Sequence, residues 1–248
     1  MQKLIRIILW IVVFSLILIG LIAWLWPGQG QGNSNTAVRD RRVLAWLAQP
    51  DEHPEWAVEG GQRCGDAPFL LPTAGYIGYL WDDSFRPGHR HQGLDIFGGT
   101  DVGETAVIAA ADGYLTRQAD WKSSLIIRIP QDPLAPERQI WMYYTHMADP
   151  QGNSLIASDF PPGSAEVYVE AGTLLGTQGN YSGTPGVPVG VHLHFSIVRD
   201  DGAGQYLNEL EIDNTLDPTP YLGIPLNVHN LAPDIPVCPP AIDSLGDT

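Results

Sequence analysis

A histidine and an aspartate lie four positions apart in the segment HQGLD, from His91 to Asp95. Zn²⁺ binds imidazole nitrogen and carboxylate oxygen at about 2.0–2.2 Å, so the two side chains must meet at one point. A straight strand would separate their Cα atoms by about 13 Å, because each residue adds about 3.3 Å. A helix would bring them together, but Gly93 and the pair Gly98-Gly99 disfavour one. We therefore predict that the chain bends at Gly93, which tolerates conformations that other residues avoid.

Two further histidines alternate in the segment HLHF, at His192 and His194. In a strand, alternate side chains face the same side about 6.6 Å apart, so both imidazoles can face one site. Leu193 and Phe195 then face the apolar side, and residues 196–198 continue the strand.

A fifth candidate is His146, which directly follows the apolar run 140–145. Together these side chains offer three ligands of the types that zinc prefers and two spare histidines, which favours a catalytic site with an open position. A closed structural site would take four protein ligands, usually including cysteine, and Cys64 and Cys238 are not clustered with the histidines. His89, two residues before His91, could compete for the metal; His53 and His229 are interpreted as surface residues.

The rest of the chain predicts β structure to position these residues. It contains 27 glycines and 21 prolines among 248 residues, which suits turn-rich β structure better than a helical bundle. Apolar, β-branched or aromatic runs lie between turn signals at 75–81, 105–110, 113–117, 124–129, 139–145, 166–169, 173–178 and 192–198. We predict an all-β, small antiparallel sandwich or barrel with an active-site groove. Asp112-Gly113 reads as a hairpin turn, and 148–163 and 180–191 read as loops.

The N-terminal residues predict a membrane anchor. Residues 7–26 carry no charged side chain, and twenty helical residues span about 30 Å, one hydrocarbon thickness. The alternative is a long signal sequence that is removed, although no A-x-A-like cleavage site follows the run. Lys3 and Arg6 lie closer to the run than the arginines after it, so we expect residues 1–6 inside and the domain on the extracytoplasmic side of the cell membrane.

The remaining boundaries follow from composition. Residues 27–63 are expected to form a flexible tether with a short helix at 38–49, residues 64–222 the folded domain and residues 223–248 a C-terminal tail. Cys64 and Cys238 lie near the two ends of that domain, and in an exported chain they are expected to form a disulfide. The formal net charge of −15 argues against nucleic-acid binding, which needs a cationic face.

Three motifs in this order, HQGLDI, YYTHM and VHLHF, resemble those of the zinc endopeptidases of the lysostaphin and LytM type. The segments 103–113 and 176–183, Asp217-Pro218 and Tyr221-Leu222 are also similar to that family, so the resemblance covers roughly residues 69–222. Some family members carry a tyrosine six residues before the first ligand, where this chain has Phe85; Tyr181 or Tyr144 could take its part.

The resemblance implies a Zn²⁺ site formed by His91, Asp95 and His194, with His146 and His192 as the catalytic pair that does not bind the metal. It also implies a small antiparallel β-sandwich with a groove, and hydrolysis of peptide crosslinks in bacterial peptidoglycan. We expect a membrane-anchored zinc metalloendopeptidase, with His192 favoured as the general base and His146 as the proton donor, or the reverse. The alternatives are a catalytically silent module that binds the wall or activates an amidase, and a peptidase for non-wall peptides.

Overall fold

The computed structural model describes residues 34–83, 88–99, 101–226 and 235–238. The predicted span at residues 7–26, as well as Phe85 and His229, lies outside these residues. Within them, no helix is long and apolar enough to cross a membrane. The strands are β1 Ala57–Val58, β2 Gly75–Tyr79, β3 Leu94–Phe97, β4 Ala106–Ile108, β5 Gly113–Thr116, β6 Leu125–Ile129, β7 Ile140–Thr145, β8 Val167–Val169, β9 Leu174–Thr177, β10 Gly179–Tyr181, β11 Pro188–Arg199 and β12 Thr215–Leu216. The helices are α2 Ser34–Ala48 and α3 Thr219–Leu222, with 3₁₀ turns at Pro50–Glu52, Pro54–Trp56 and Ile212–Asn214.

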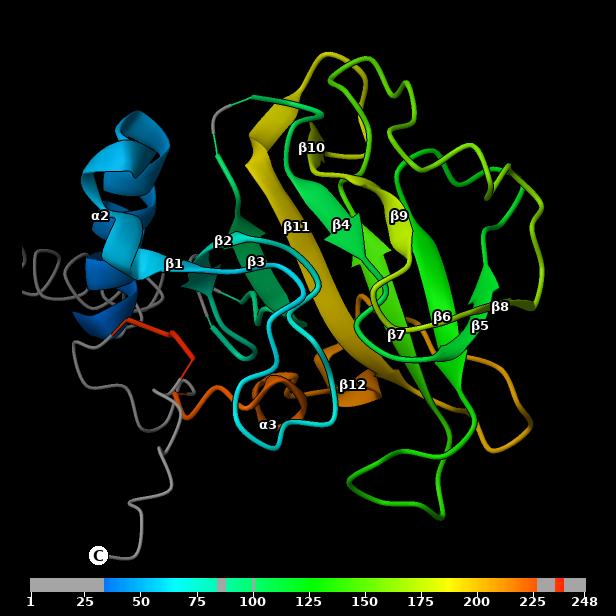
Figure 1. Cartoon of the computed structure of the whole chain (residues 1–248). Coiled ribbons are helices and arrows are strands. Elements are labelled where there is room, and N and C mark those ends of the chain that lie inside the picture. The colour runs from blue at the N-terminus through cyan, green and yellow to red at the C-terminus, as the bar shows by residue number, and fades with distance from the viewer. Residues whose placement is uncertain (1–33, 84–87, 100, 227–234, 239–248) are drawn as a thin grey trace, which may run out of the picture.

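Most strands form one large antiparallel sheet in the order β1-β2-β3-β11-β7-β6-β5-β8, with β10 and β12 also paired to β11. The long strand β11 runs through the middle of this sheet (Figure 1). Each of the eight predicted apolar runs coincides with all or part of a strand, so the all-β antiparallel prediction is confirmed. The expected loop at 180–191 is shorter than predicted, because β10 and the first residues of β11 pair with each other there.

The predicted hairpin across Asp112-Gly113 is wrong. β4 pairs with β9 in a separate two-stranded sheet, whereas β5 pairs with β6 and β8 of the large sheet. Ala109 exchanges backbone hydrogen bonds with the 172–173 turn, so the chain crosses from one sheet to the other between β4 and β5. A turn signal predicts a change of direction but does not identify the partner strand.

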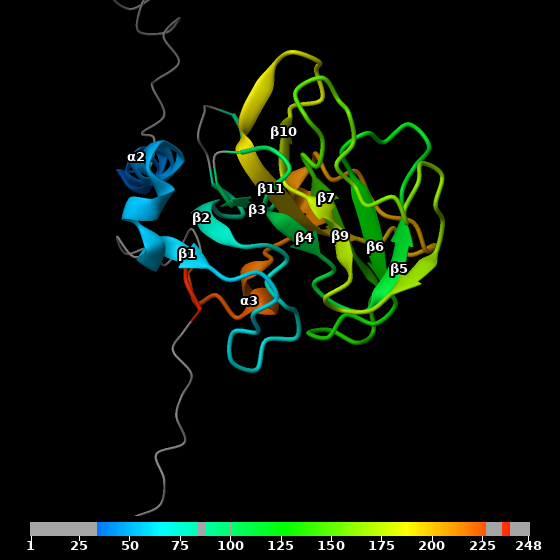
Figure 2. The same ribbon diagram turned by 45° about the horizontal axis from the view of Figure 1, so that its top comes forward.

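The main core lies between the two sheets, and β4 and β9 lie in front of the large sheet in both views (Figures 1 and 2). Val107 and Leu175 of the small sheet pack in the same buried cluster as Leu193, Phe195 and Ile197 of β11. Because side chains alternate along a strand, His192, His194 and Ser196 project from the opposite face of β11. The predicted apolar and polar faces of the HLHF segment are therefore confirmed.

The described part of the predicted tether is folded. The short helix is confirmed, although it begins at Ser34 rather than 38, and β1 adds to the edge of the large sheet. The folded part of the chain thus begins before Cys64. The expected disulfide between Cys64 and Cys238 is present and links residues 174 positions apart. It brings residues 235–238 back to the start of the domain, where Ile235 packs against the apolar cluster under α2.

Candidate metal centre

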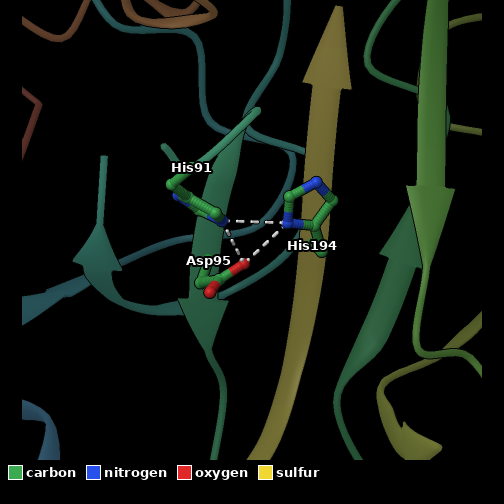
Figure 3. Close-up of side chains that lie close together, drawn as sticks. All are labelled: His91, Asp95 and His194. Carbon is green, nitrogen blue, oxygen red and sulfur yellow. Dashed lines mark hydrogen bonds and ion pairs between the residues drawn. The ribbon is translucent and has the colours of Figure 1, made fainter. Parts of the chain in front are cut away.

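His91, Asp95 and His194 converge on one point, as the resemblance implies (Figure 3). His91 Nε2 lies 3.0 Å from Asp95 Oδ1 and 3.0 Å from His194 Nδ1, and His194 Nδ1 lies 2.8 Å from Asp95 Oδ1. All three side chains are buried. Among the described residues, this trio forms the one group of three or more histidine, cysteine or acidic side chains close enough to hold a metal ion.

The register of the sheet brings the ligands together. Asp95 of β3 and His194 of β11 are directly paired residues, so their side chains leave the same face of adjacent strands. His91 lies before β3 and folds back, which confirms that the chain bends between His91 and Asp95. Gly93 contributes differently from the prediction: it does not adopt a positive φ, but a Cβ there would lie 2.3 Å from the carbonyl oxygen of Phe195. The glycine is therefore required for the close approach to β11.

The second nitrogen of each metal-facing ring is fixed by an acceptor. His91 Nδ1 donates to the carbonyl of Leu80 at 2.9 Å, which leaves a lone pair on Nε2. His194 Nε2 donates to Glu209 Oε1 at 2.9 Å. His91 Nε2, His194 Nδ1 and Asp95 Oδ1 therefore meet as three potential acceptors. They repel one another unless a cation or a proton lies among them. This donor set fits Zn²⁺, which accepts two imidazoles and a carboxylate in open catalytic sites.

The charges of the site attract a cation. Burial alone raises the pKa of Asp95, but the nearby imidazoles of His91, His192 and His194 outweigh burial and hold that pKa well below its usual value. Burial lowers the pKa of His194, and the hydrogen bonds to Asp95 and Glu209 outweigh it and raise the pKa to about 10. The two carboxylates, Asp95 and Glu209, therefore favour a positive charge at this point.

His146 and His192 lie beside the ligand trio, with ring centroids 4.4 Å apart. His146 Nδ1 donates to the Tyr181 carbonyl at 2.7 Å and His192 Nδ1 donates to the Gly190 carbonyl at 2.7 Å, so each ring keeps a lone pair on Nε2. Burial lowers the pKa of His146 to about 3 and also lowers the pKa of His192. Both rings are therefore neutral at pH 7 and able to accept a proton.

These side chains line one pocket of about 440 Å³, which fits the predicted groove. His146 has a φ of 71°, a left-handed conformation that is rare for a non-glycine residue and often marks a functional site.

His89 also lines this pocket but does not belong to the group of His91, Asp95 and His194. His53, interpreted as a surface residue, stacks on Trp56 with ring centroids 3.8 Å apart.

One polar residue of the site, Glu209, was not predicted from the sequence. Glu209 lies in the loop after β11 and binds both His194 and the hydroxyl of Ser196. The segment 208–213 contains three acidic residues, and nothing in its pattern distinguishes Glu209 from the others.

Tyr144 and Tyr181 were the two candidates to supply the hydroxyl that Phe85 lacks. Tyr144 is fully buried and its hydroxyl accepts a hydrogen bond from the Ala110 amide, whereas Tyr181 lines the pocket.

Several solved structures are similar to this chain. Lysostaphin from Staphylococcus simulans, an antimicrobial peptidase, shares 19% identity over 59% of this chain and 48% of its own, with a TM-score of 0.38. Its catalytic domain crystallised alone shares 20% identity over 60% of this chain and 90% of its own, also with a TM-score of 0.38. A catalytic-domain variant of the prophage-encoded M23 protein EnpA from Enterococcus faecalis shares 19% identity over 62% and 95%, with a TM-score of 0.35. No protein-family model and no curated protein sequence matches the chain significantly.

Proposed function

We propose that this protein is a zinc metalloendopeptidase that hydrolyses peptide crosslinks of bacterial peptidoglycan. One observation carries the proposal: the candidate ligand atoms of His91, Asp95 and His194 meet at a point beside His146 and His192 in one pocket. A peptidase of this type needs an electrophilic metal and groups that move protons, and this site offers residues for both requirements.

The chemistry divides between the bound ion and the two histidines. When held by His91, Asp95 and His194, Zn²⁺ would polarise the peptide carbonyl and lower the pKa of water in the open position. His192 Nε2 lies 3.6 Å from Asp95 Oδ1, so its lone pair faces the metal-binding point and suits it to take a proton from the attacking water. His146 is placed to donate a hydrogen bond to the developing charge or a proton to the leaving amine, once it is protonated. The alternative is that His146 takes the proton from the water and His192 acts as the donor.

The peptidoglycan substrate is supported by the resemblance of the three sequence motifs to the lysostaphin and LytM type. The acidic chain disfavours electrostatic attraction to anionic wall polymers, so we assign recognition to the shape and hydrogen bonds of the groove. An uncharged N-terminal run would tether the enzyme to the cell membrane by a single span, with the catalytic domain on the extracytoplasmic side. Such a tether suits remodelling of nearby wall.

A catalytically silent wall-binding or amidase-activating module is the second candidate. Such modules lack some metal-binding or catalytic residues, whereas all five positions are filled here and lie together. The direct test incubates the full chain with purified muropeptides of several crosslink chemistries and identifies the products by mass spectrometry. We expect a new amine and carboxylate at one crosslink, abolished by EDTA and restored by Zn²⁺. Intact muropeptides from a zinc-loaded protein would favour the silent module or a non-wall substrate.

A further inference from the structure

The first metal ligand, His91, is held by a turn that precedes it by eight residues. The His91 amide donates to the Asp83 carbonyl at 2.7 Å, and the His91 carbonyl accepts from the Asp82 amide at 2.8 Å. The imidazole Nδ1 donates to the Leu80 carbonyl at 2.9 Å. Both the backbone and the ring orientation of His91 therefore depend on the shape of the turn Leu80–Asp83.

The side chain of Asp83 closes this turn from inside. Its Oδ2 accepts a hydrogen bond from the Leu80 amide at 2.8 Å, and its Oδ1 binds the guanidinium of Arg39. The side chains of Asp83 and Arg39 are 0% and 5% exposed, so this ion pair is buried. Arg39 lies 44 positions before Asp83 in the chain and belongs to α2. This helix is outside the region of motif resemblance.

The helix α2 has a second connection to the site. Val43 and Trp46 of α2 pack in one buried cluster with Tyr76 of β2 and Phe97 of β3. The ring of Phe97 stacks on His192 with centroids 4.9 Å apart. In both views α2 lies beside β2, at the edge of the large sheet (Figures 1 and 2). Gly78 permits this contact, because a Cβ there would lie 2.6 Å from Val43 Cγ2.

We propose that Arg39 is a positioning residue of the metal centre, which acts through Asp83 and the Leu80–Asp83 turn to hold His91 toward Asp95 and His194. The helix that follows the N-terminal segment is then part of the metal-binding unit, and a catalytic fragment starting at Cys64 would bind the metal poorly. The physical reason is that a buried carboxylate that loses its cation must regain partners from water, and the entry of water opens the turn. The inference depends on the assigned ligands and adds to them a residue that does not touch the metal.

The test measures the dissociation constant for Zn²⁺ of the full chain by competition with a chromophoric chelator, and records the visible spectrum of the Co²⁺-loaded protein. The variants are Arg39→Met, which removes the cation but keeps much of the side-chain volume, and Arg39→Lys, which restores the charge. Arg41→Met, at an exposed position of the same helix, is the matched control. Circular dichroism of each metal-free variant shows whether it is folded.

We expect Arg39→Met to bind Zn²⁺ about tenfold or more weakly than wild type and to show an altered Co²⁺ spectrum. Arg39→Lys should recover part of the affinity, and Arg41→Met should match wild type. A folded Arg39→Met protein with wild-type affinity and spectrum overturns the proposal.

If Arg39→Met does not fold, the double variant Arg39→Met with Asp83→Asn replaces it, because it leaves no unpaired buried charge. The Zn²⁺ affinity and the Co²⁺ spectrum of the double variant are then compared with those of wild type. If the double variant also fails to fold, Arg39 has a general structural role and the proposal is overturned. A wild-type chain that takes up no metal would instead contradict the metal centre itself, so the two failures are distinguishable.

Discussion

His146 and His194 lie in the same pocket but face different atoms, and substitution should separate their roles. His194 Nδ1 points at Asp95 and His91, whereas His146 is turned toward His192 and the Tyr181 carbonyl. We predict that His194→Ala loses both Zn²⁺ and hydrolysis, because one of three ligands is removed. His146→Ala should keep one Zn²⁺ per chain and lose about 10²–10⁴-fold in turnover, the contribution typical of a general acid or base.

Metal content by atomic absorption and turnover with muropeptides check the two variants in parallel. Near-wild-type turnover by His146→Ala would remove this histidine from the mechanism. Loss of the metal from His146→Ala would mean that the ring supports the metal site instead.

Glu209 should tune the affinity for the metal through His194. Its carboxylate accepts the His194 Nε2 hydrogen and so fixes the ring with Nδ1 toward the metal-binding point. Glu209→Ala is expected to weaken Zn²⁺ binding by about 10–100-fold, the usual effect of losing such an outer partner. Glu209→Gln keeps an acceptor oxygen and should fall between Ala and wild type. Glu211→Gln, at an exposed position of the same loop, is the control. Equal loss of affinity in Glu209→Gln and Glu211→Gln would argue against a specific effect of Glu209.

At the scale of elements, the contact between β3 and β11 decides whether the ligands meet. A Cβ at position 93 would lie 2.3 Å from the Phe195 carbonyl oxygen, so Gly93→Ala must push the strands apart. We predict a loss of about 1–3 kcal/mol in the free energy of unfolding, as for other overpacked sites, together with weaker Zn²⁺ binding. Denaturant unfolding measures the first effect. Gly99→Ala, where a Cβ would meet nothing within 4 Å, should leave both quantities unchanged.

The sequence predicted the elements better than their pairing. Alternation of apolar residues is a local signal, so the HLHF strand and its two faces were predictable from four residues. The partner of β4 depends on where the chain crosses between sheets, which no local turn signal encodes, and the Asp112-Gly113 hairpin was wrong for that reason. The residue types and spacings indicated a metal site, whereas the choice of His91, Asp95 and His194 as its ligands came from the resemblance of the three motifs. Glu209 and Arg39 were not predicted, because an acidic loop residue and a helical arginine look like ordinary surface charges until the fold buries them.

In the molecule as a whole, the disulfide links the C-terminal segment 235–238 to the chain between β1 and β2. It closes a loop between Cys64 and Cys238, 174 positions apart, and holds Ile235 against the cluster under α2. On the chain-entropy account, replacing both cysteines by serine should lower the free energy of unfolding by about 5 kcal/mol. Denaturant unfolding of the double variant, and of wild type with and without reductant, measures this difference. Equal unfolding midpoints in all samples would mean that the bridge contributes nothing to stability.

A single divalent ion is expected to join β3, β11 and His91, which lies three residues before β3, into one reactive centre. The most direct measurement is anomalous diffraction at the zinc absorption edge from crystals of the zinc-loaded protein. We predict one strong peak per chain, bonded to His91 Nε2, Asp95 Oδ1 and His194 Nδ1, with His146 and His192 outside bonding distance. No peak at this position, or a zinc ion held by other side chains, would show that these three residues do not form the metal centre.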